Sequence, residues 1–193
     1  MKTRCTWCGE DPLYVAYHDE EWGVPTRDDR TLFEFIILEG AQAGLAWITI
    51  LKKREGYRDL FDNFDAQKIA RYSDKKLDKI LLDARIIRNR LKVYGARKNA
   101  LAFLQVQKEF GCFSDYIWAF VDGKPMQTKW QSQADLPAIT SISDTISKDM
   151  KKRGFTFVGS TIMYAYMQAC GMVNDHTTTC FRKHECEKFD LAH

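Results

Sequence analysis

Cysteine and histidine side chains gather near both ends of the chain. Zinc in structural sites takes four nitrogen or sulfur ligands in a tetrahedron, so two pairs from distant segments could tie the ends together. The candidate ligands are Cys5, His18, His176 and Cys180. Four protein ligands leave no position for a catalytic water, so such a site would be structural. The spacing also fits residues that are merely exposed, which is our interpretation of Cys8, His184 and Cys186.

Aromatic side chains crowd the N-terminal part of the chain around one acidic residue. They are Trp7, Tyr14, Tyr17, Trp22 and Trp47. Packing in a helical core explains most tryptophans and tyrosines. Glu39 does not fit that explanation, because it ends an apolar run and a carboxylate among apolar neighbours must find donors or change its pKa. Flat rings with one carboxylate would suit a planar ligand that is cationic or bears N–H groups, such as a nucleobase.

The segment 82–90 lies between two runs of helical apolar spacing and resembles a helix-hairpin-helix connector. In such a connector, a tight turn presents backbone N–H groups at the start of the second helix to a DNA phosphate. Arg85, Arg88 and Arg90 are therefore candidate DNA contacts. Arg85 stands where these hairpins usually have glycine, and a positive φ at this position would be strained.

Opposite charges are segregated along the chain, although 29 basic and 26 acidic side chains give a net charge of only +3. Residues 10–39 hold nine acidic and two basic residues, whereas residues 51–100 hold fifteen basic and seven acidic ones. No acidic residue occurs between Arg85 and Lys98, so a polyanion would bind the middle of the chain. Each charge run taken alone also fits a solvated helix face.

The composition is that of a globular chain. The chain is 45% hydrophobic and 28% charged, which excludes collagen-like, low-complexity and mostly disordered classes. The net charge of only +3 excludes a histone-like tail protein, and the length of 193 residues predicts a single domain. We find no apolar run that could span a bilayer and no secretory leader. We therefore expect a cytoplasmic protein whose six cysteines are free or metal-bound rather than paired.

Helix signals dominate and predict an all-α fold. Thr31 and Glu34 form a capping-box pattern that predicts the start of a helix. Further helices are expected over 43–51, from Ser73 or Asp74 to 81, over 91–104, from Ser143 or Asp144 to 154, and over 160–172. The one strand that we expect covers 155–158, and the composition of 122–137 predicts an irregular connector.

Four long segments have unusual sequences: DPLYVAYHDEEWGVP (11–25), LEGAQAGLAWITILKKRE (38–55), IIRNR (86–90) and KKRGFTFVGSTIMYAYMQACGMVNDH (151–176). Together they closely resemble the DNA-3-methyladenine glycosylase I family of bacterial base-excision enzymes. The resemblance covers nearly the whole chain, and only the tail after Cys180 lacks a counterpart. Departures from the family pattern are Arg85, in place of a turn-forming residue, and Ala46 and Ala165, where the family often has serine.

The resemblance implies a helix-hairpin-helix glycosylase fold in one domain, residues 1–193, with termini tied by a structural zinc on the four candidate ligands. The hairpin lobe would cover approximately 30–120, and a second lobe approximately 1–29 and 140–185. The aromatic residues would enclose a flipped base, and Glu39 would bind the polar edge of that base. Gly44 and Leu45 would enter the gap left in the duplex.

The activity implied is hydrolytic excision of 3-methyladenine from double-stranded DNA that contains an alkylated purine, by a monomer. No lysine can be singled out as a nucleophile, because the many lysines lie in charged runs where their pKa stays high, so we expect no strand-cleaving lyase activity. The carboxylate of Asp175 is expected to support the neighbouring ligand His176.

Three other functions remain open at this point. A non-catalytic DNA-binding module stapled by zinc would explain the basic hairpin and the metal ligands, but it has no use for an acid among aromatic rings. A zinc hydrolase would lose its chemistry, and not its stability, when the metal is removed. A related glycosylase with a different choice of base, such as 3-methylguanine, would have a similar pocket.

Overall fold

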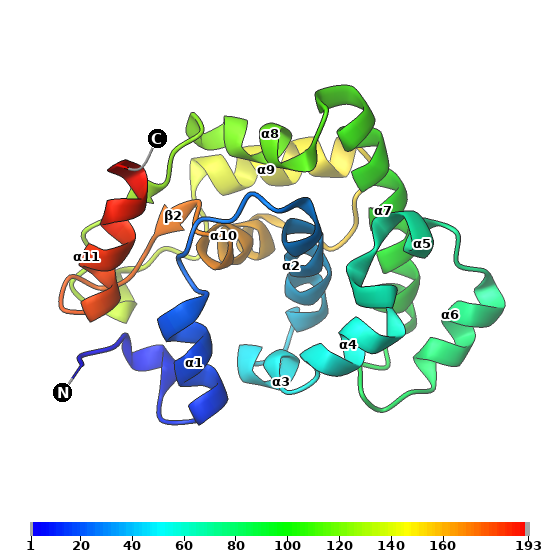
Figure 1. The fold of residues 1–193 in the computed structure, drawn as a ribbon, viewed down its shortest axis with the longest axis horizontal. Helices are drawn as coiled ribbons and strands as arrows, with labels where there is room; N and C mark the ends of the chain where they lie inside the picture. The colour runs from blue at the N-terminus through cyan, green and yellow to red at the C-terminus, as the bar shows by residue number, and fades with distance from the viewer. Residues whose placement is uncertain (1, 192–193) are drawn as a thin grey trace.

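The computed structural model describes residues 2–191, which form a helical molecule (Figure 1). Its helices are α1 (Pro12–Glu20), α2 (Asp29–Gln42), α3 (Trp47–Leu51), α4 (Arg54–Leu60), α5 (Ala66–Ala70), α6 (Asp74–Leu81), α7 (Arg90–Phe110), α8 (Phe113–Trp118), α9 (Ser141–Lys152), α10 (Ser160–Ala169) and α11 (Phe181–Glu187). Two short strands, β1 (Met126–Gln127) and β2 (Val173–Asn174), pair in parallel. The predicted all-α class is confirmed. No described helix is long and apolar enough to cross a membrane.

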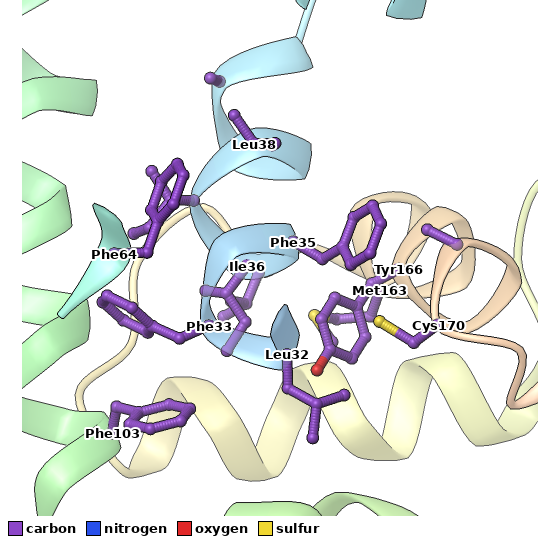
Figure 2. Close-up of a cluster of buried hydrophobic side chains, with 14 of the residues drawn as sticks. Leu32, Phe33, Phe35, Ile36, Leu38, Phe64, Phe103, Met163, Tyr166 and Cys170 are labelled. Carbon is purple, nitrogen blue, oxygen red and sulfur yellow. The ribbon is translucent and has the colours of Figure 1, made fainter. Parts of the chain in front are cut away.

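Helix α2 is the central element of the core. Nearly its whole length is buried, and Figure 2 shows it between Phe103 of α7 on one side and Met163 and Tyr166 of α10 on the other. The ring centroids of Phe33 and Phe103 lie 4.8 Å apart. Burial of one such side chain contributes roughly 1.5–3 kcal/mol. The packing on both sides therefore fixes α2, and with it Glu39 near its C-terminal end.

The start of α2 differs from the predicted capping box. The carboxylate of Asp28 accepts a hydrogen bond from the backbone N–H of Thr31, at 2.8 Å, and from the Thr31 hydroxyl, at 2.7 Å. The helix therefore begins three residues earlier than predicted. Glu34 does not reach back to the cap, because its Oε1 accepts from Nε of Arg54 at 2.6 Å inside the protein.

The two termini meet at one end of the molecule. The N-terminal segment and α11 lie on the same side in Figure 1, and the backbone N–H of Phe181 donates to the carbonyl of Thr3 at 2.9 Å. The short β1–β2 pair joins the connector after α8 to the segment that follows α10. The approximate lobe boundaries stay a prediction.

The connector between α6 and α7 forms a tight turn, as the hairpin pattern predicts. Ser73 caps α6, as expected, and Asn89 caps α7. Arg85 has no positive φ, so the strain expected at this position does not arise. The Asp83 carboxylate accepts from the backbone N–H of Arg85 at 2.8 Å. Gly56 of α4 makes room for the turn, because a Cβ there would lie 2.5 Å from the Cβ of Arg85.

Several other predicted elements are wrong in their bounds or type. Of the helix expected over 43–51, only the part that is α3 (Trp47–Leu51) forms, because the chain turns at Gly44, where φ is +82°. Helix α9 begins after Thr140, which caps it, rather than at Ser143 or Asp144, and α10 ends at 169 rather than 172. The connector 122–137 contains β1.

The segment 155–158 is no strand. Phe157 has a φ of +57°, which interrupts extended backbone, and its side chain packs against Gly40 and Gly95.

Helix α7 was predicted over 91–104, but Leu91 and Leu101 of the predicted pattern are exposed. The packed face of α7 instead carries Phe103 and small residues, which let other segments come close.

Candidate functional site

The six residues predicted from the aromatic cluster line one pocket of about 230 Å³. They are Trp7, Tyr14, Tyr17, Trp22, Glu39 and Trp47. The Trp7 ring lies 5.0 Å from the ring of Tyr14 and 4.9 Å from that of Trp22, between centroids. The rings of Tyr17 and Trp47 are 5.4 Å apart. The 3-10 helix Thr6–Cys8, α1 with the turn after it, and α3 thus supply aromatic walls, and α2 supplies the one acid.

Glu39 is buried at the wall of this pocket. The residue is 4% exposed, and its Oε2 has no hydrogen-bond partner in the described part of the chain. Burial raises the pKa of Glu39 from its ordinary value of 4.5 to about 8. The side chain is therefore mostly protonated at pH 7 in the free protein. A cationic ligand in the pocket would draw it back toward the carboxylate.

The indole N–H groups of Trp7 and Trp47 are also buried without a partner among residues 2–191. A buried donor that meets no acceptor costs free energy. Both rings line the same pocket as Glu39. The pocket therefore presents unsatisfied polar atoms beside its flat apolar walls, a combination typical of a site for a polar planar ligand.

Three glutamines that sequence reasoning missed also line the pocket: Gln42, Gln133 and Gln168. Gln42 follows Glu39 by three residues on α2, and Gln168 follows the lining residue Ala165 by three on α10. Residues three apart share one face of a helix, so this spacing was a usable signal. Gln133 lies in the irregular connector, where no periodic pattern could have marked it.

The four candidate metal ligands meet in the folded chain. Cys5, His18, His176 and Cys180 are all buried, and their ligand atoms lie within 4.8 Å of one another. The Sγ of Cys180 lies 3.4 Å from Nε2 of His18 and 3.5 Å from Nδ1 of His176. The Sγ of Cys5 lies 3.6 Å from Nδ1 of His176. A tetrahedral zinc with bonds of about 2.3 Å to sulfur and about 2.0 Å to nitrogen would separate these ligands by about 3.5 Å. The donor set therefore fits a metal ion.

Each histidine has its other ring nitrogen held by an oxygen acceptor. Nδ1 of His18 lies 2.8 Å from the Asp19 carboxylate, which also binds Arg4. Nε2 of His176 lies 3.0 Å from the Trp22 carbonyl oxygen. These contacts fix the tautomers in which Nε2 of His18 and Nδ1 of His176 carry no proton, as a metal ligand requires. Trp22 thereby links the metal cluster to the pocket.

Two expectations about neighbouring residues are wrong. The Asp175 carboxylate does not bind the ring of His176, because it accepts from other side chains, Gln168 among them. Cys8 and Cys186 are buried rather than exposed, whereas His184 is exposed as expected. The thiol of Cys8 donates to the carbonyl of Cys5.

The turn between α2 and α3 carries the predicted duplex-entering residues. Leu45 is 40% exposed and follows Gly44, whose positive φ the turn requires. The ammonium group of Lys92, on α7, donates to the carbonyl oxygens of Ala41, at 2.7 Å, and Ala43, at 2.9 Å. Burial lowers the pKa of Lys92. Lys92 thus joins the second helix of the hairpin to the end of α2.

The three predicted DNA-binding arginines differ in their surroundings. Arg85 pairs with Asp83 and Asp59, and Arg90 pairs with Asp78 at 2.8 Å. Arg88 is exposed and forms no ion pair within the described residues. Arg88 is therefore the hairpin arginine most available to a phosphate, while the other two would first exchange a carboxylate for it.

Comparison with known proteins decides the family. The model of the methyladenine glycosylase family matches residues 7–183. The chain belongs to the methyladenine glycosylase family. DNA-3-methyladenine glycosylase 1 of Escherichia coli K12 is 51% identical over 177 residues, which cover 92% of this chain and 95% of that protein.

Solved structures of the family have the same fold. A crystal structure of 3-methyladenine DNA glycosylase I superimposes with a TM-score of 0.91 at 51% identity, covering 93% of this chain and 98% of that one. A variant of a 3-methyladenine DNA glycosylase I in complex with 3-methyladenine also gives 0.91, at 32% identity, covering 93% of this chain and 97% of that one. The resemblance predicted from the four segments is confirmed.

Proposed function

We propose that this chain is a monofunctional DNA glycosylase that excises 3-methyladenine from alkylated double-stranded DNA and so initiates base-excision repair. The observation that carries the proposal is the buried, unpaired Glu39 in a pocket walled by aromatic rings. Enzymes that act on a base must take it out of the stack and read it in a pocket of this kind. The bound base named for a family structure supports the same assignment.

The chemistry asks little of the protein beyond binding. Methylation at N3 makes the adenine cationic, so the bond between N9 and C1′ is already weakened. When it breaks, the electron pair stays with the base, which leaves neutral. Water adds to C1′ of the oxocarbenium-like sugar and gives up its second proton to solvent. Extrusion of the nucleotide costs a few kcal/mol, less for a damaged base than for a normal one.

Glu39 and the rings have separate roles in this proposal. As the cationic nucleotide enters, the carboxyl group of Glu39 gives its proton to solvent and becomes a carboxylate that accepts a hydrogen bond from the exocyclic amine. The negative charge favours damaged, cationic bases over normal ones. Trp47 and Tyr17 stack on the ring. Leu45 fills the gap in the duplex, and Arg88 together with the start of α7 holds a phosphate.

A zinc ion on Cys5, His18, His176 and Cys180 is part of this proposal. Two thiolates and two imidazoles suit zinc, and they leave no open position for a water or substrate. When bound, the ion supplies structural cross-linking and no step of the reaction. The four ligands join α1 and the segment before it to the segment after β2, and Trp22 connects this site to the pocket.

We infer further that the protein acts as a monomer in the cytoplasm. A non-catalytic DNA-binding module is the alternative, and the polar atoms buried without partners in the pocket argue against it. No lysine lines the pocket among the described residues, which supports hydrolysis rather than a Schiff-base lyase. Borohydride trapping of a covalent adduct with DNA would contradict the monofunctional assignment.

The test of the proposed function is single-turnover excision from methylated DNA by wild type and Glu39→Gln. We expect Glu39→Gln to lower the excision rate by about 10²-fold or more while DNA binding changes little, because glutamine keeps the shape and loses the charge. Equal rates in the two proteins would remove Glu39 from the site.

A further inference from the structure

Asp175 is a buried carboxylate next to the pocket, 1% exposed. It accepts hydrogen bonds from four side chains. The donors are Thr128 Oγ1 at 2.9 Å, Trp130 Nε1 at 2.8 Å, Tyr164 Oη and Gln168 Nε2 at 2.8 Å. An indole N–H can only donate, and two donors reach each carboxylate oxygen. Asp175 is therefore an acceptor with a fixed position.

The orientation of the Gln168 amide follows from this neighbour. An amide group has one donor end and one acceptor end, and a carboxylate oxygen accepts only. The end that faces Oδ2 of Asp175 must be the NH₂ group. Oε1 therefore points away from Asp175, and it accepts no hydrogen bond from the described residues.

The rest of Gln168 is held as well. The residue lies in the last turn of α10, and its backbone carbonyl accepts from the N–H of Gly23 at 3.0 Å. Its side chain lines the same pocket as Glu39. The amide oxygen is thus a preorganised acceptor at the pocket wall, because turning it away would break the bond to Asp175.

We propose that Gln168 is a specificity-determining residue whose Oε1, oriented by Asp175, accepts a hydrogen bond from the exocyclic amino group of 3-methyladenine. This inference rests on the proposed function. A purine with a carbonyl oxygen at the same carbon would bring a second acceptor against Oε1. The Gln168 amide cannot turn to donate instead, so the pocket selects against 6-oxo purines.

The test measures how the protein chooses between two free bases. Quenching of tryptophan fluorescence gives the Kd of 3-methyladenine and of 3-methylhypoxanthine, which has oxygen in place of the amino group. We expect the preference of the wild type for 3-methyladenine to fall about tenfold in Gln168→Met, which keeps the length and loses the acceptor. A preference that stays within twofold of the wild type would overturn the inference.

Gln133 provides a matched control. Its side chain lines the same pocket but makes no hydrogen bond to a carboxylate in the described chain. Gln133→Met should change both affinities alike and leave their ratio unchanged. A fall in that ratio equal to the fall in Gln168→Met would also overturn the inference, because any glutamine at the pocket wall would then suffice.

Two further arms keep the result readable. If Gln168→Met does not fold, as judged by its near-ultraviolet circular dichroism, Gln168→Ala takes its place, because alanine adds no new contact. Release of 3-methyladenine from methylated DNA is measured in parallel on the wild type. If the wild type releases the base and Gln168→Met keeps the preference of the wild type, only the role of Gln168 is contradicted. Wild type that releases none contradicts the proposed function itself.

Discussion

Glu39 shows how a functional residue can oppose the stability of the fold that positions it. The residue is 4% exposed and lies near the C-terminal end of α2, a helix most of whose residues are buried. In its ionised form, the Glu39 carboxylate would be buried away from water with no cation beside it, which costs free energy. The same burial that lets Glu39 sense a cationic base therefore lowers the stability of the empty protein as the pH rises.

The stability of the wild type should depend on pH through this residue. Burial raises the pKa of Glu39 from 4.5 to about 8, so between these values the unfolded state has lost a proton that the folded state keeps. The free energy of unfolding then falls as pH rises, by about 3 kcal/mol between pH 5 and pH 8. Urea titrations of wild type and Glu39→Gln at both pH values measure it. Glu39→Gln should not show this fall in the free energy of unfolding. An identical pH dependence in the two proteins would contradict the raised pKa of Glu39.

Residue types that are unusual for their surroundings were predictable from the sequence. Glu39 stood out as an acid in an apolar run, and Cys5 and His176 as metal-binding types at opposite ends. Gln168 did not stand out, because a glutamine on a helix is ordinary. Its proposed role depends on the hydrogen bond to Asp175 and on its position at the pocket wall, and only folding brings these together.

At the scale of elements, the contact between α2 and α7 links the candidate DNA-binding hairpin to the pocket. Lys92 donates to the carbonyl groups of Ala41, in the last turn of α2, and of Ala43, directly after it, next to the turn that carries Leu45. A cation at a helix C-terminus is favourable, and this one also fixes the direction in which the chain leaves the helix. The hairpin and the turn should therefore act as one unit.

Lys92→Met should slow excision about tenfold or more, because the two hydrogen bonds from a charged donor are lost and the turn loses its fixed direction. Binding of free 3-methyladenine, measured by fluorescence, should stay unchanged. Lys92→Arg keeps the charge and should recover part of the rate. If Lys92→Met weakened free-base binding as much as excision, Lys92 would act on the pocket and not on the turn.

The hairpin arginines should differ in their contribution to DNA affinity. Arg88→Ala should weaken binding to any duplex and lower the slope of log K against log salt by about one, because one phosphate contact is lost. Arg85→Ala should change that slope less, since Arg85 already pairs with Asp83 and Asp59. Fluorescence anisotropy over a salt series measures both. Equal slopes for Arg88→Ala and wild type would place the phosphate elsewhere.

Element types were easier to predict than element ends. Helical periodicity identified α2, α6, α7, α9 and α10. The cap of α2 was predicted at the wrong residue because Asp28 and Thr31 are both good cap residues. Glu34 accepts a hydrogen bond from Arg54 and is therefore not available for a capping box with Thr31. The strand expected at 155–158 was wrong because Phe157 takes a positive φ to pack against two glycines, a tertiary effect with no local signal.

For the whole molecule, the cluster of cysteines and histidines connects the two ends of the chain. Its ligands come from residues up to 175 positions apart, so a metal bound to all four closes a long loop and strongly restricts the conformations of the chain. The buried position of all four also means that thiols and rings without a metal would be packed against one another at a cost. Metal binding and folding should therefore be coupled.

Removing the metal should lower stability before it affects chemistry. Incubation with a strong chelator is expected to lower the Tm by several degrees or more, since structural zinc contributes folding free energy directly. Protein that remains folded should still release base. Calorimetry and excision on the same samples measure both, and Cys112→Ser is a control cysteine outside the cluster. Loss of activity with an unchanged Tm would instead indicate a catalytic metal.

The most direct test of the central claim is to incubate the protein with methylated duplex DNA and to identify every base released by chromatography. The pocket of aromatic rings around Glu39 predicts that 3-methyladenine is released, that normal adenine is not, and that Glu39→Gln releases far less. If no 3-methyladenine appears, or if Glu39→Gln releases it as fast as the wild type, the pocket does not do what we propose.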